Sequence, residues 1–322
     1  MAFSILITGG TGFVGKHLVQ LLLKQSGISI AVLSSGRNFA ADSQVHHYQA
    51  DLRNGDHVAG IVREVNPTHV YHLAAVSAID ASWSDPKLTY EINFWGARNV
   101  FEAAVKLPSA ARILNVSTSQ VYGRSRDRLT ESSPVAPESP YAASKAMSEF
   151  LRIEFGSFSS GGVVTARPFN HSGPGQSPNF VLAAMAKQFA EMSLGLSPPK
   201  LSVGNVAVKR DFTDVRDVVV AYALLMEKGR VGDIYNVCSG STVSLSDVIK
   251  MFEAASNIRV DVVSSPNKIR PGEADEICGD PRKITSDTGW SPKISLQKTI
   301  VDLLDYWRSL LGPRPSAVLT GL

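Results

Sequence analysis

Short apolar runs alternate with amphipathic stretches along the first half of this 322-residue chain. Each run is five or six residues long, which is typical of buried strands. The runs predict strands at Phe3–Ile7, Ile28–Leu33, Val45–Gln49, His69–Leu73, Arg112–Val116 and Val163–Arg167. The stretches between them predict helices near Lys16–Lys24, Asp56–Val65, Leu88–Lys106 and Tyr141–Phe155. Strands that alternate with helices form βαβ units, so we expect an α/β fold with a doubly wound parallel sheet.

The alternation weakens after Phe169. The later pattern predicts helices at Asn179–Met192, Asp214–Lys228, Leu245–Ser256 and Leu296–Leu311, and a buried run, IYNVCS, after the second of them. Ser244 is suited to cap the helix that follows it. We therefore expect a larger sheet unit and a smaller, discontinuous α/β lobe for substrate. The larger unit takes residues 1–168 plus about 208–238, and the lobe takes residues 169–207 plus about 239–322.

Composition and charge narrow the class of protein. Hydrophobic residues make up 44% and charged residues 19% of the chain, which is typical of a globular protein. The net charge of +3 is too small and too scattered to favour nucleic acid as a partner. The chain has no basic leader and no apolar run near the roughly 20 residues of a membrane helix, so we expect a cytoplasmic protein without a membrane partner. Cys238 and Cys278 match no metal or redox spacing, so we expect free thiols and no metal site.

Three glycines follow the first predicted strand and open the first helix, in the segment ILITGGTGFVGKHL. Gly9, Gly12 and Gly15 allow the backbone to turn tightly and approach a pyrophosphate, while the start of the helix supplies free N–H groups. This order of strand, glycine turn and helix predicts a Rossmann-type dinucleotide-binding unit. The other cofactor contacts expected in this turn are Thr11, Phe13 and Val14.

The residue that reads the adenosine ribose is expected about 20 residues further on, at the end of the second strand. The chain has Ser34 and Ser35 there, without a carboxylate, and Arg37 follows in SSGRN. A carboxylate repels a 2′-phosphate, whereas small hydroxyls and a guanidinium suit it. We therefore expect NADP(H) in preference to NAD(H), with Ser35 and Arg37 among its contacts. The ends of the third and fourth strands supply further expected contacts, namely Asp51, Leu52, Leu73, Ala74 and Ala75.

The segment STSQVYG ends the fifth strand, and YAASK opens the helix that comes next. Tyr141 and Lys145 are four residues apart and share one face of that helix. The Lys145 ammonium favours phenolate over phenol, so we expect it to lower the pKa of Tyr141 and to make Tyr141 a general acid or base. Thr118, at the strand end, is suited to hydrogen-bond a substrate oxygen.

Together, TGGTGFVG, HLAA, STSQVYG and YAASK resemble the extended short-chain dehydrogenases/reductases, which include nucleotide-sugar epimerases, dehydratases and reductases. The resemblance covers nearly the whole chain. It implies that Thr118, Tyr141 and Lys145 are the catalytic residues and that Lys145 also binds the nicotinamide ribose. It further implies a homodimer formed through the helices near Leu88–Lys106 and Tyr141–Phe155.

Ser119 and Gln120 bear on which reaction of this family to expect. The sugar 4,6-dehydratases of the family carry Glu at the position of Gln120, and some carry Asp just before it. An amide cannot accept and return a proton near neutral pH, so dehydration is disfavoured. Hydride transfer to or from C4 of the sugar is feasible, with Tyr141 handling the proton.

The segment RPFNHSGPGQ and the later KRDFTDVRD, YNVCSG and RPGE are most similar to the bacterial GDP-4-keto-6-deoxy-D-mannose reductases of this family. The resemblance implies NADPH-dependent reduction of the C4 ketone of a GDP-linked sugar to GDP-6-deoxy-D-mannose (GDP-D-rhamnose), a polysaccharide precursor. It implies that Asn170 contacts the sugar or the diphosphate and that His171 borders the nicotinamide. Cations of the smaller lobe are suited to face the two phosphates. The expected substrate contacts are Ser77, Asn170, Phe180, Val181, Lys187, Arg210, Arg270 and Glu273.

Three other functions are open at this point. A nucleotide-sugar 4-epimerase would retain its NAD, and a GDP-mannose 4,6-dehydratase would need a carboxylate where Gln120 stands. The third is a nucleotide-sensing protein of the same fold that performs no chemistry. The intact Thr118, Tyr141 and Lys145 disfavour it, because a sensor has no need of a proton-transfer pair.

Overall fold

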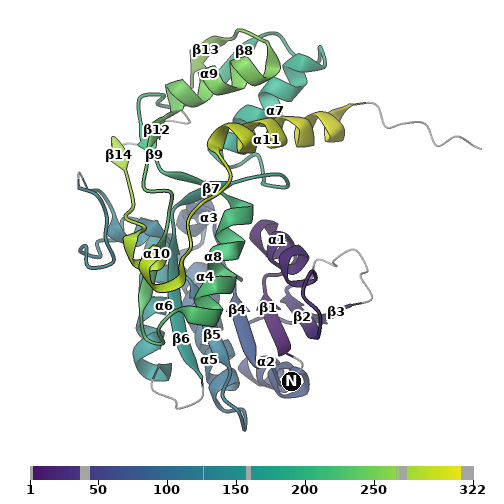
Figure 1. Ribbon diagram of the computed structural model, residues 1–322, viewed down its shortest axis with the longest axis vertical. Coiled ribbons are helices and arrows are strands. Elements are labelled where there is room, and N and C mark those ends of the chain that lie inside the picture. Colours follow the sequence, from purple (N-terminus) through teal and green to yellow (C-terminus); the bar gives the residue numbers. More distant parts are fainter. Residues whose placement is uncertain are drawn as a thin grey trace, which may run out of the picture.

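The computed structural model describes residues 3–36, 44–125, 127–156, 161–265, 267 and 274–312. Within them, seven parallel strands form one central sheet in the order β11-β6-β5-β4-β1-β2-β3 (Figure 1). The predicted parallel sheet is confirmed, and each predicted strand differs from the observed one by at most one residue at either end. The strands are β1 (Phe3–Thr8), β2 (Ile28–Ser34), β3 (Val45–Gln49), β4 (His69–His72), β5 (Arg112–Val116), β6 (Gly162–Pro168) and β11 (Ile234–Val237).

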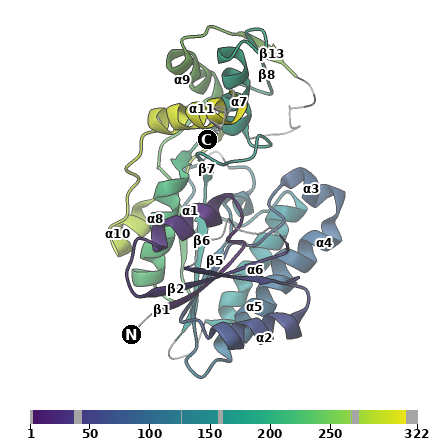
Figure 2. The ribbon, with the colours of Figure 1, turned by 90° about the vertical axis from the view of Figure 1, so that its right-hand side faces the viewer.

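Helices cover both faces of the sheet (Figure 2). One face packs against α1 and α8, and the other against α2, α5 and α6, so the strands bury side chains on both sides. This burial on both faces explains why Ile5, Leu6 and Ile7 of β1 are consecutive apolar residues rather than alternating with polar ones. No helix in the described part of the chain is both long and apolar enough to cross a membrane. The helices are α1 (Phe13–Leu22), α2 (Gly55–Val65), α3 (Ile79–Ser84), α5 (Ala97–Val105), α6 (Pro140–Phe155) and α8 (Val215–Lys228).

The predicted helix Leu88–Lys106 is not one regular α-helix. It begins as α4 (Pro86–Tyr90), continues through a π-helical turn at Glu91–Gly96 and ends as α5. A Cβ on Gly96 would lie 2.9 Å from the Cβ of Leu52, which follows β3. The wider turn therefore approaches the sheet closely at a glycine, and such π turns are common near functional sites.

A smaller α/β lobe lies beyond the carboxyl ends of the sheet strands (Figure 1). Its three helices enclose an apolar core of their own, in which the Phe189 and Phe252 rings stack with centroids 5.2 Å apart. A two-stranded parallel sheet packs beside them. The elements of the lobe are α7 (Val181–Ser193), α9 (Leu245–Ser256), α11 (Leu296–Leu311), β8 (Lys200–Val203) and β13 (Asp261–Ser264).

Short strands connect the two units: β7 (Asn170–Ser172) pairs in parallel with β10 (Phe212–Asp214), and β9 (Lys209–Arg210) pairs with β12 (Val243–Ser244) and β14 (Glu276–Ile277). One later helix belongs with the larger unit. α10 (Arg282–Thr288) packs against α8 and β11, and Ile284 is part of the core on that face of the sheet. The expected boundary assigns α10 to the smaller lobe, so its packing differs from that expectation. The division of the chain into these two units is otherwise a proposal.

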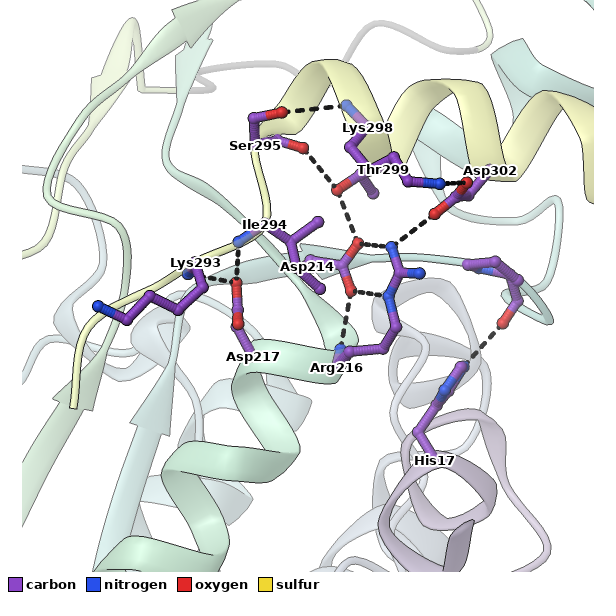
Figure 3. Close-up of polar contacts among 11 residues, drawn as sticks. His17, Asp214, Arg216, Asp217, Lys293, Ile294, Ser295, Lys298, Thr299 and Asp302 are labelled. Carbon is purple, nitrogen blue, oxygen red and sulfur yellow. Dashed lines mark hydrogen bonds and ion pairs between the residues drawn. The ribbon is translucent and has the colours of Figure 1, made fainter. Parts of the chain in front are cut away.

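The two units meet at the amino terminus of α8 (Figure 3). Asp214 caps this helix and also accepts a hydrogen bond from Thr299 of α11, at 2.7 Å. Asp217, in the first turn, accepts hydrogen bonds from the backbone N–H groups of Lys293 and Ile294, which lead into α11. Hydrogen bonds therefore link α11 of the smaller lobe, and the segment that leads into it, to α8 of the larger unit.

Candidate functional site

A cavity of about 1010 Å³ opens at the carboxyl ends of the sheet strands and is lined by residues of both units. Open parallel sheets bind ligands at this edge, where the strand order reverses, here between β1 and β4. The lining contains the predicted catalytic and cofactor residues Gly9, Thr11, Gly12, Phe13, Val14, Gly15, Ser35, Asp51, Leu52, Leu73, Ala74, Ala75, Thr118, Tyr141, Lys145 and His171. It also contains four predicted substrate residues, namely Ser77, Asn170, Phe180 and Val181. The predicted residues Arg37, Arg270 and Glu273 lie outside the described residues.

Two predicted substrate cations do not line this cavity. Lys187 pairs with Glu191 one helical turn along α7, at 3.6 Å, and its ammonium lies 6.0 Å from the centroid of the Trp307 ring on α11. Arg210 is buried, and its guanidinium donates a hydrogen bond to the carbonyl of Ala274. Lys187 thus packs within the smaller lobe and Arg210 within the short sheet that contains β9, and neither lines the cavity.

The glycine turn has the close packing that a dinucleotide site requires. Gly9 has a φ of 71°, and a Cβ there would lie 2.8 Å from the backbone nitrogen of Ala74. A Cβ on Gly15 would lie 2.5 Å from the carbonyl oxygen of Gly9. Gly12 is the N-cap of α1 and has no side chain to satisfy the first N–H groups of the helix, so these groups face the cleft. The positive end of α1 is therefore free to bind an anion.

The start of α6 carries the predicted catalytic pair. Ser139 caps the helix through a hydrogen bond to Ala142 N–H, and Pro140 occupies its first turn, so Tyr141 and Lys145 lie on the first two turns. The buried Lys145 Nζ donates a hydrogen bond to the carbonyl of Val116 at the end of β5, at 2.7 Å. These elements place phenol, ammonium and the β5 end on one wall of the cavity.

The acidity of the pair differs from the prediction. Burial raises the pKa of Tyr141, and a hydrogen bond with Thr118 only partly opposes this rise. The expected lowering of the Tyr141 pKa is therefore wrong for this arrangement, because desolvation is the largest effect. Burial lowers the pKa of Lys145 to about 8, while the Glu149 carboxylate acts in the opposite direction. At neutral pH, Tyr141 is a phenol, which has a proton to give.

The segment RPFNHSGPGQ forms β7 and a tight turn beside the glycine-rich helix. His171 Nδ1 lies 2.9 Å from the carbonyl oxygen of Phe169, and burial lowers the pKa of His171, so its imidazole is neutral. The ring stacks in parallel with Phe13, with centroids 6.3 Å apart. The turn is held by His17 of α1, whose Nε2 lies 2.8 Å from the carbonyl oxygen of Pro174. The strand end thus delivers Asn170 and His171 to the cavity and joins them to the cofactor helix.

Some residues that shape the cavity have no clear signal in the sequence. Gln176 lines it and donates a hydrogen bond to the carbonyl of His171, at 2.9 Å. Ser117 also lines it, and its hydroxyl donates to the Glu149 carboxylate, at 2.5 Å. Glu149 lies four residues after Lys145, so helical spacing could have indicated its position but not its partners.

The lining fits a dinucleotide better than a metal ion. Within the described ranges, no cluster of His, Cys, Asp or Glu is arranged to hold a metal. A Cβ at Gly9 or Gly15 would collide with neighbouring backbone, so the tight turn requires glycine, and the first turn of α1 has no side-chain cap and can offer N–H donors to a pyrophosphate. The wall that carries Tyr141 and Lys145 lies in the same cavity. The geometry is therefore suited to a redox dinucleotide and a second ligand side by side.

Comparison with protein families gives one match over most of the chain. The family described as GDP-mannose 4,6 dehydratase matches residues 6–303. The chain is 33% identical over 312 residues to the GDP-6-deoxy-D-mannose reductase of Pseudomonas aeruginosa, a match that covers 96% of this chain and 98% of that protein. It is 23% identical over 348 residues to the GDP-mannose 4,6-dehydratase of Yersinia enterocolitica, covering 93% and 92% of the two chains.

Solved structures agree in fold over nearly the full length. The structure of RMD from P. aeruginosa complexed with NADPH has a TM-score of 0.83 and 31% identity, covering 96% of this chain and 100% of that one. The UDP-glucose 4-epimerase of Thermus thermophilus in complex with NAD has a TM-score of 0.84 and 32% identity, covering 95% and 99%. The predicted Rossmann-type fold is confirmed.

Proposed function

The chain belongs to the GDP-mannose 4,6-dehydratase family of extended short-chain dehydrogenases/reductases, and from this premise we propose that it reduces the C4 ketone of GDP-4-keto-6-deoxy-D-mannose with NADPH. The product is GDP-6-deoxy-D-mannose, a precursor for polysaccharide synthesis. Within this family the chain is an NADP(H)-dependent oxidoreductase that acts on nucleotide sugars. The observation that carries the specific reaction is that Thr118, Tyr141 and Lys145 share the cavity with Gln120, an amide where dehydration needs a carboxylate.

Each residue of the cavity wall has a separate role in the proposed ketone reduction. The bound nicotinamide supplies the hydride to C4. Tyr141, a phenol at neutral pH because burial raises its pKa, gives its proton to the C4 oxygen. Thr118 hydrogen-bonds the same oxygen and stabilises the negative charge that develops there. Lys145 orients the nicotinamide ribose, and its ammonium stabilises the phenolate that Tyr141 leaves behind.

The opposite end of the cavity supports the choice of cofactor. The first turn of α1 would bind the pyrophosphate through backbone N–H groups, and Asp51 and Leu52, which line the same cavity, would border the adenine. β2 ends at Ser34 and Ser35 follows, so at this strand end the described residues offer no carboxylate to repel a 2′-phosphate. Without that repulsion a 2′-phosphate is accepted.

A second copy of the chain is part of the proposal. α6 and the π-helical turn, which pack against each other, both expose large apolar side chains: Trp95 is 54%, Phe150 is 63% and Ile153 is 63% exposed. Monomeric proteins rarely leave such a group of apolar side chains in water. We propose that this face pairs with its equivalent in a homodimer, as the resemblance to the family implies.

A coupled assay tests the reaction. GDP-mannose, a separate 4,6-dehydratase and NADPH are supplied together, and the loss of reduced nicotinamide is followed by absorbance. We expect NADPH consumption only when the dehydratase is present, and a product with the mass of a GDP-deoxyhexose. The same assay with a dTDP- or UDP-linked 4-keto sugar tests the base, and a preference for either of these would contradict the GDP assignment.

The two enzymatic alternatives give different results in the same assay. A dehydratase would convert GDP-mannose without the separate enzyme and without net consumption of NADPH. A 4-epimerase would retain a nucleotide through gel filtration and interconvert sugars with no added cofactor. Either result would replace the reductase assignment.

A further inference from the structure

A buried ion pair lies behind the catalytic wall. The Arg167 guanidinium donates to both oxygens of Glu149, with Nε–Oε1 at 2.8 Å and Nη2–Oε2 at 2.6 Å. Glu149 is 4% exposed and Arg167 is 2% exposed, so solvent does not screen the pair. A buried pair of this kind adds little to stability compared with apolar residues of the same size. Its presence next to the cavity therefore calls for a functional explanation.

The pair holds the end of the strand that carries Thr118. Glu149 Oε1 also accepts a hydrogen bond from the hydroxyl of Ser117, which directly precedes Thr118. The backbone N–H of Ser117 donates to the carbonyl of Ala166, the residue before Arg167, at 2.8 Å. β5, α6 and β6 are thus joined by Ser117, the residue directly before Thr118.

The same carboxylate acts on Lys145. Glu149 follows Lys145 by one turn of α6, and it counteracts the burial that lowers the pKa of Lys145 to about 8. The other titratable groups around this lysine do not help to keep it charged. Tyr141, on α6, is a phenol, and His72, from β4, is neutral because burial lowers its pKa to about 3. From β6, the Arg167 guanidinium is bound to both oxygens of Glu149.

We propose that Glu149 is a positioning residue of the reductase, which fixes Thr118 through Ser117 and supports the ammonium form of Lys145, with Arg167 as the counterion that lets the carboxylate stay buried. This inference rests on the proposed function, since it assigns Glu149 a task in the same reaction. Glu149 touches neither the cofactor nor the sugar in this scheme. Its effect is carried by Ser117 and Lys145.

The electrostatic part is tested on the titration of Lys145 itself. Glu149→Gln alone leaves the Arg167 charge unpaired and endangers folding, so Glu149→Gln/Arg167→Met removes both charges together. Isotope-labelled lysine is followed by NMR, and the Lys145 signal is assigned by its absence in Lys145→Met. We expect a midpoint near pH 8 in the wild type and one lower by roughly one unit in the double variant. An unchanged midpoint overturns this part.

Activity provides the second readout. In the double variant, the alkaline limb of the kcat profile should move to lower pH with the Lys145 midpoint, a shift that mere loss of packing does not produce. Ser117→Ala should lower kcat by roughly tenfold while the KM for NADPH and the Lys145 midpoint stay unchanged. A wild-type kcat in Ser117→Ala overturns the positioning part.

A matched control lies on the same helix. Glu154 pairs with Arg98 at 2.5 Å, but its side chain is 42% exposed. Glu154→Gln should leave kcat, its pH profile and the Lys145 midpoint as in the wild type. A shift of the Lys145 midpoint in this variant as large as in the double variant would assign the effect to overall charge and reject the inference. If the wild type consumes no NADPH with any 4-keto sugar, the proposed function fails, whereas the Lys145 titration still decides the role of Glu149.

Discussion

Asp214 and Arg216 form a closed contact at the amino terminus of α8 (Figure 3). The Asp214 carboxylate accepts hydrogen bonds from the backbone N–H of Arg216 at 2.8 Å and from its guanidinium at 2.8 and 2.7 Å. The same guanidinium reaches Asp302 of α11 at 2.8 Å. Asp214 also belongs to β10, which pairs with the strand of Asn170 and His171. This contact therefore sets the position of the smaller lobe relative to the catalytic wall.

Arg216→Met should weaken sugar binding more than cofactor binding. The substitution leaves the buried Asp214 carboxylate with fewer donors and removes the Arg216–Asp302 contact between α8 and α11, so the free energy of unfolding should fall by roughly 1–3 kcal/mol. Because the lobe is then less well placed, we expect the KM for the nucleotide sugar to rise by roughly threefold or more, with NADPH affinity unchanged. Lys298→Met, which removes only an exposed partner of Asp302, is the control. An equal loss of affinity for NADPH and for the nucleotide sugar would contradict the claim that this contact positions only the sugar-binding lobe.

Local chemistry explains why the catalytic wall and the glycine turn were predictable. Gly9 and Gly15 stand in a strand–turn–helix order, and Tyr141 and Lys145 in an i,i+4 order; each depends on neighbours in the sequence. Lys187 does not line the cavity, because the direction of its side chain depends on how α7 packs against α11, which sequence spacing does not contain.

The error on Tyr141 and the missed ion pair have the same origin. The spacing of Tyr141 and Lys145 suggests a charge effect on the phenol, but burial is a property of the whole fold and outweighs it. Glu149 and Arg167 come from a helix and a strand, and only tertiary structure joins them. The sequence therefore predicted which residues line the cavity better than it predicted their environment.

Gly15→Ala should abolish cofactor binding. The new Cβ would lie 2.5 Å from both the Gly9 carbonyl oxygen and the Gly10 Cα, so the pyrophosphate turn must open. We expect NADPH affinity, measured by fluorescence titration, to fall by at least roughly tenfold. Gly60→Ala is the matched control in α2, where a Cβ meets nothing within 4 Å. That substitution should raise the free energy of unfolding by roughly 0.5–1 kcal/mol and leave NADPH binding intact.

Phe150→Glu should separate the proposed dimer. Phe150 is 63% exposed on α6, so a carboxylate there is tolerated by the folded chain but not by an apolar interface. Light scattering after gel filtration should give the mass of one chain for the variant and of two for the wild type. Val262→Glu places the same charge on β13 of the smaller lobe, where Val262 is 48% exposed, and should remain dimeric. A monomeric wild type, or a dimeric Phe150→Glu, contradicts the proposed interface.

His72 should make the fold sensitive to acid. Burial lowers its pKa to about 3 in the folded chain, whereas an unfolded chain binds the same proton near pH 6.5. The unfolded state therefore binds more protons between these values, and stability falls as the pH falls from 6.5 towards 3. The Asn of His72→Asn cannot be protonated. Between pH 7 and pH 4, the free energy of unfolding measured in urea should therefore fall by roughly 3 kcal/mol less in the variant than in the wild type. A wild-type to variant difference that stays constant with pH would refute this account.

Tyr141→Phe should remove the chemistry and keep the cofactor. The phenyl ring fills the same space beside Thr118, but the proton for the C4 oxygen is gone, so kcat should fall by roughly 10²- to 10⁴-fold. NADPH affinity should change less than roughly twofold, because the glycine turn and Lys145 are intact. Tyr235→Phe is the control for the loss of a buried phenol. Tyr235 lies on β11, outside the cavity lining, and its hydroxyl donates to Asp287 of α10 at 2.8 Å. It should lower the melting temperature without lowering kcat, and a Tyr141→Phe enzyme with wild-type kcat would exclude Tyr141 as the proton donor.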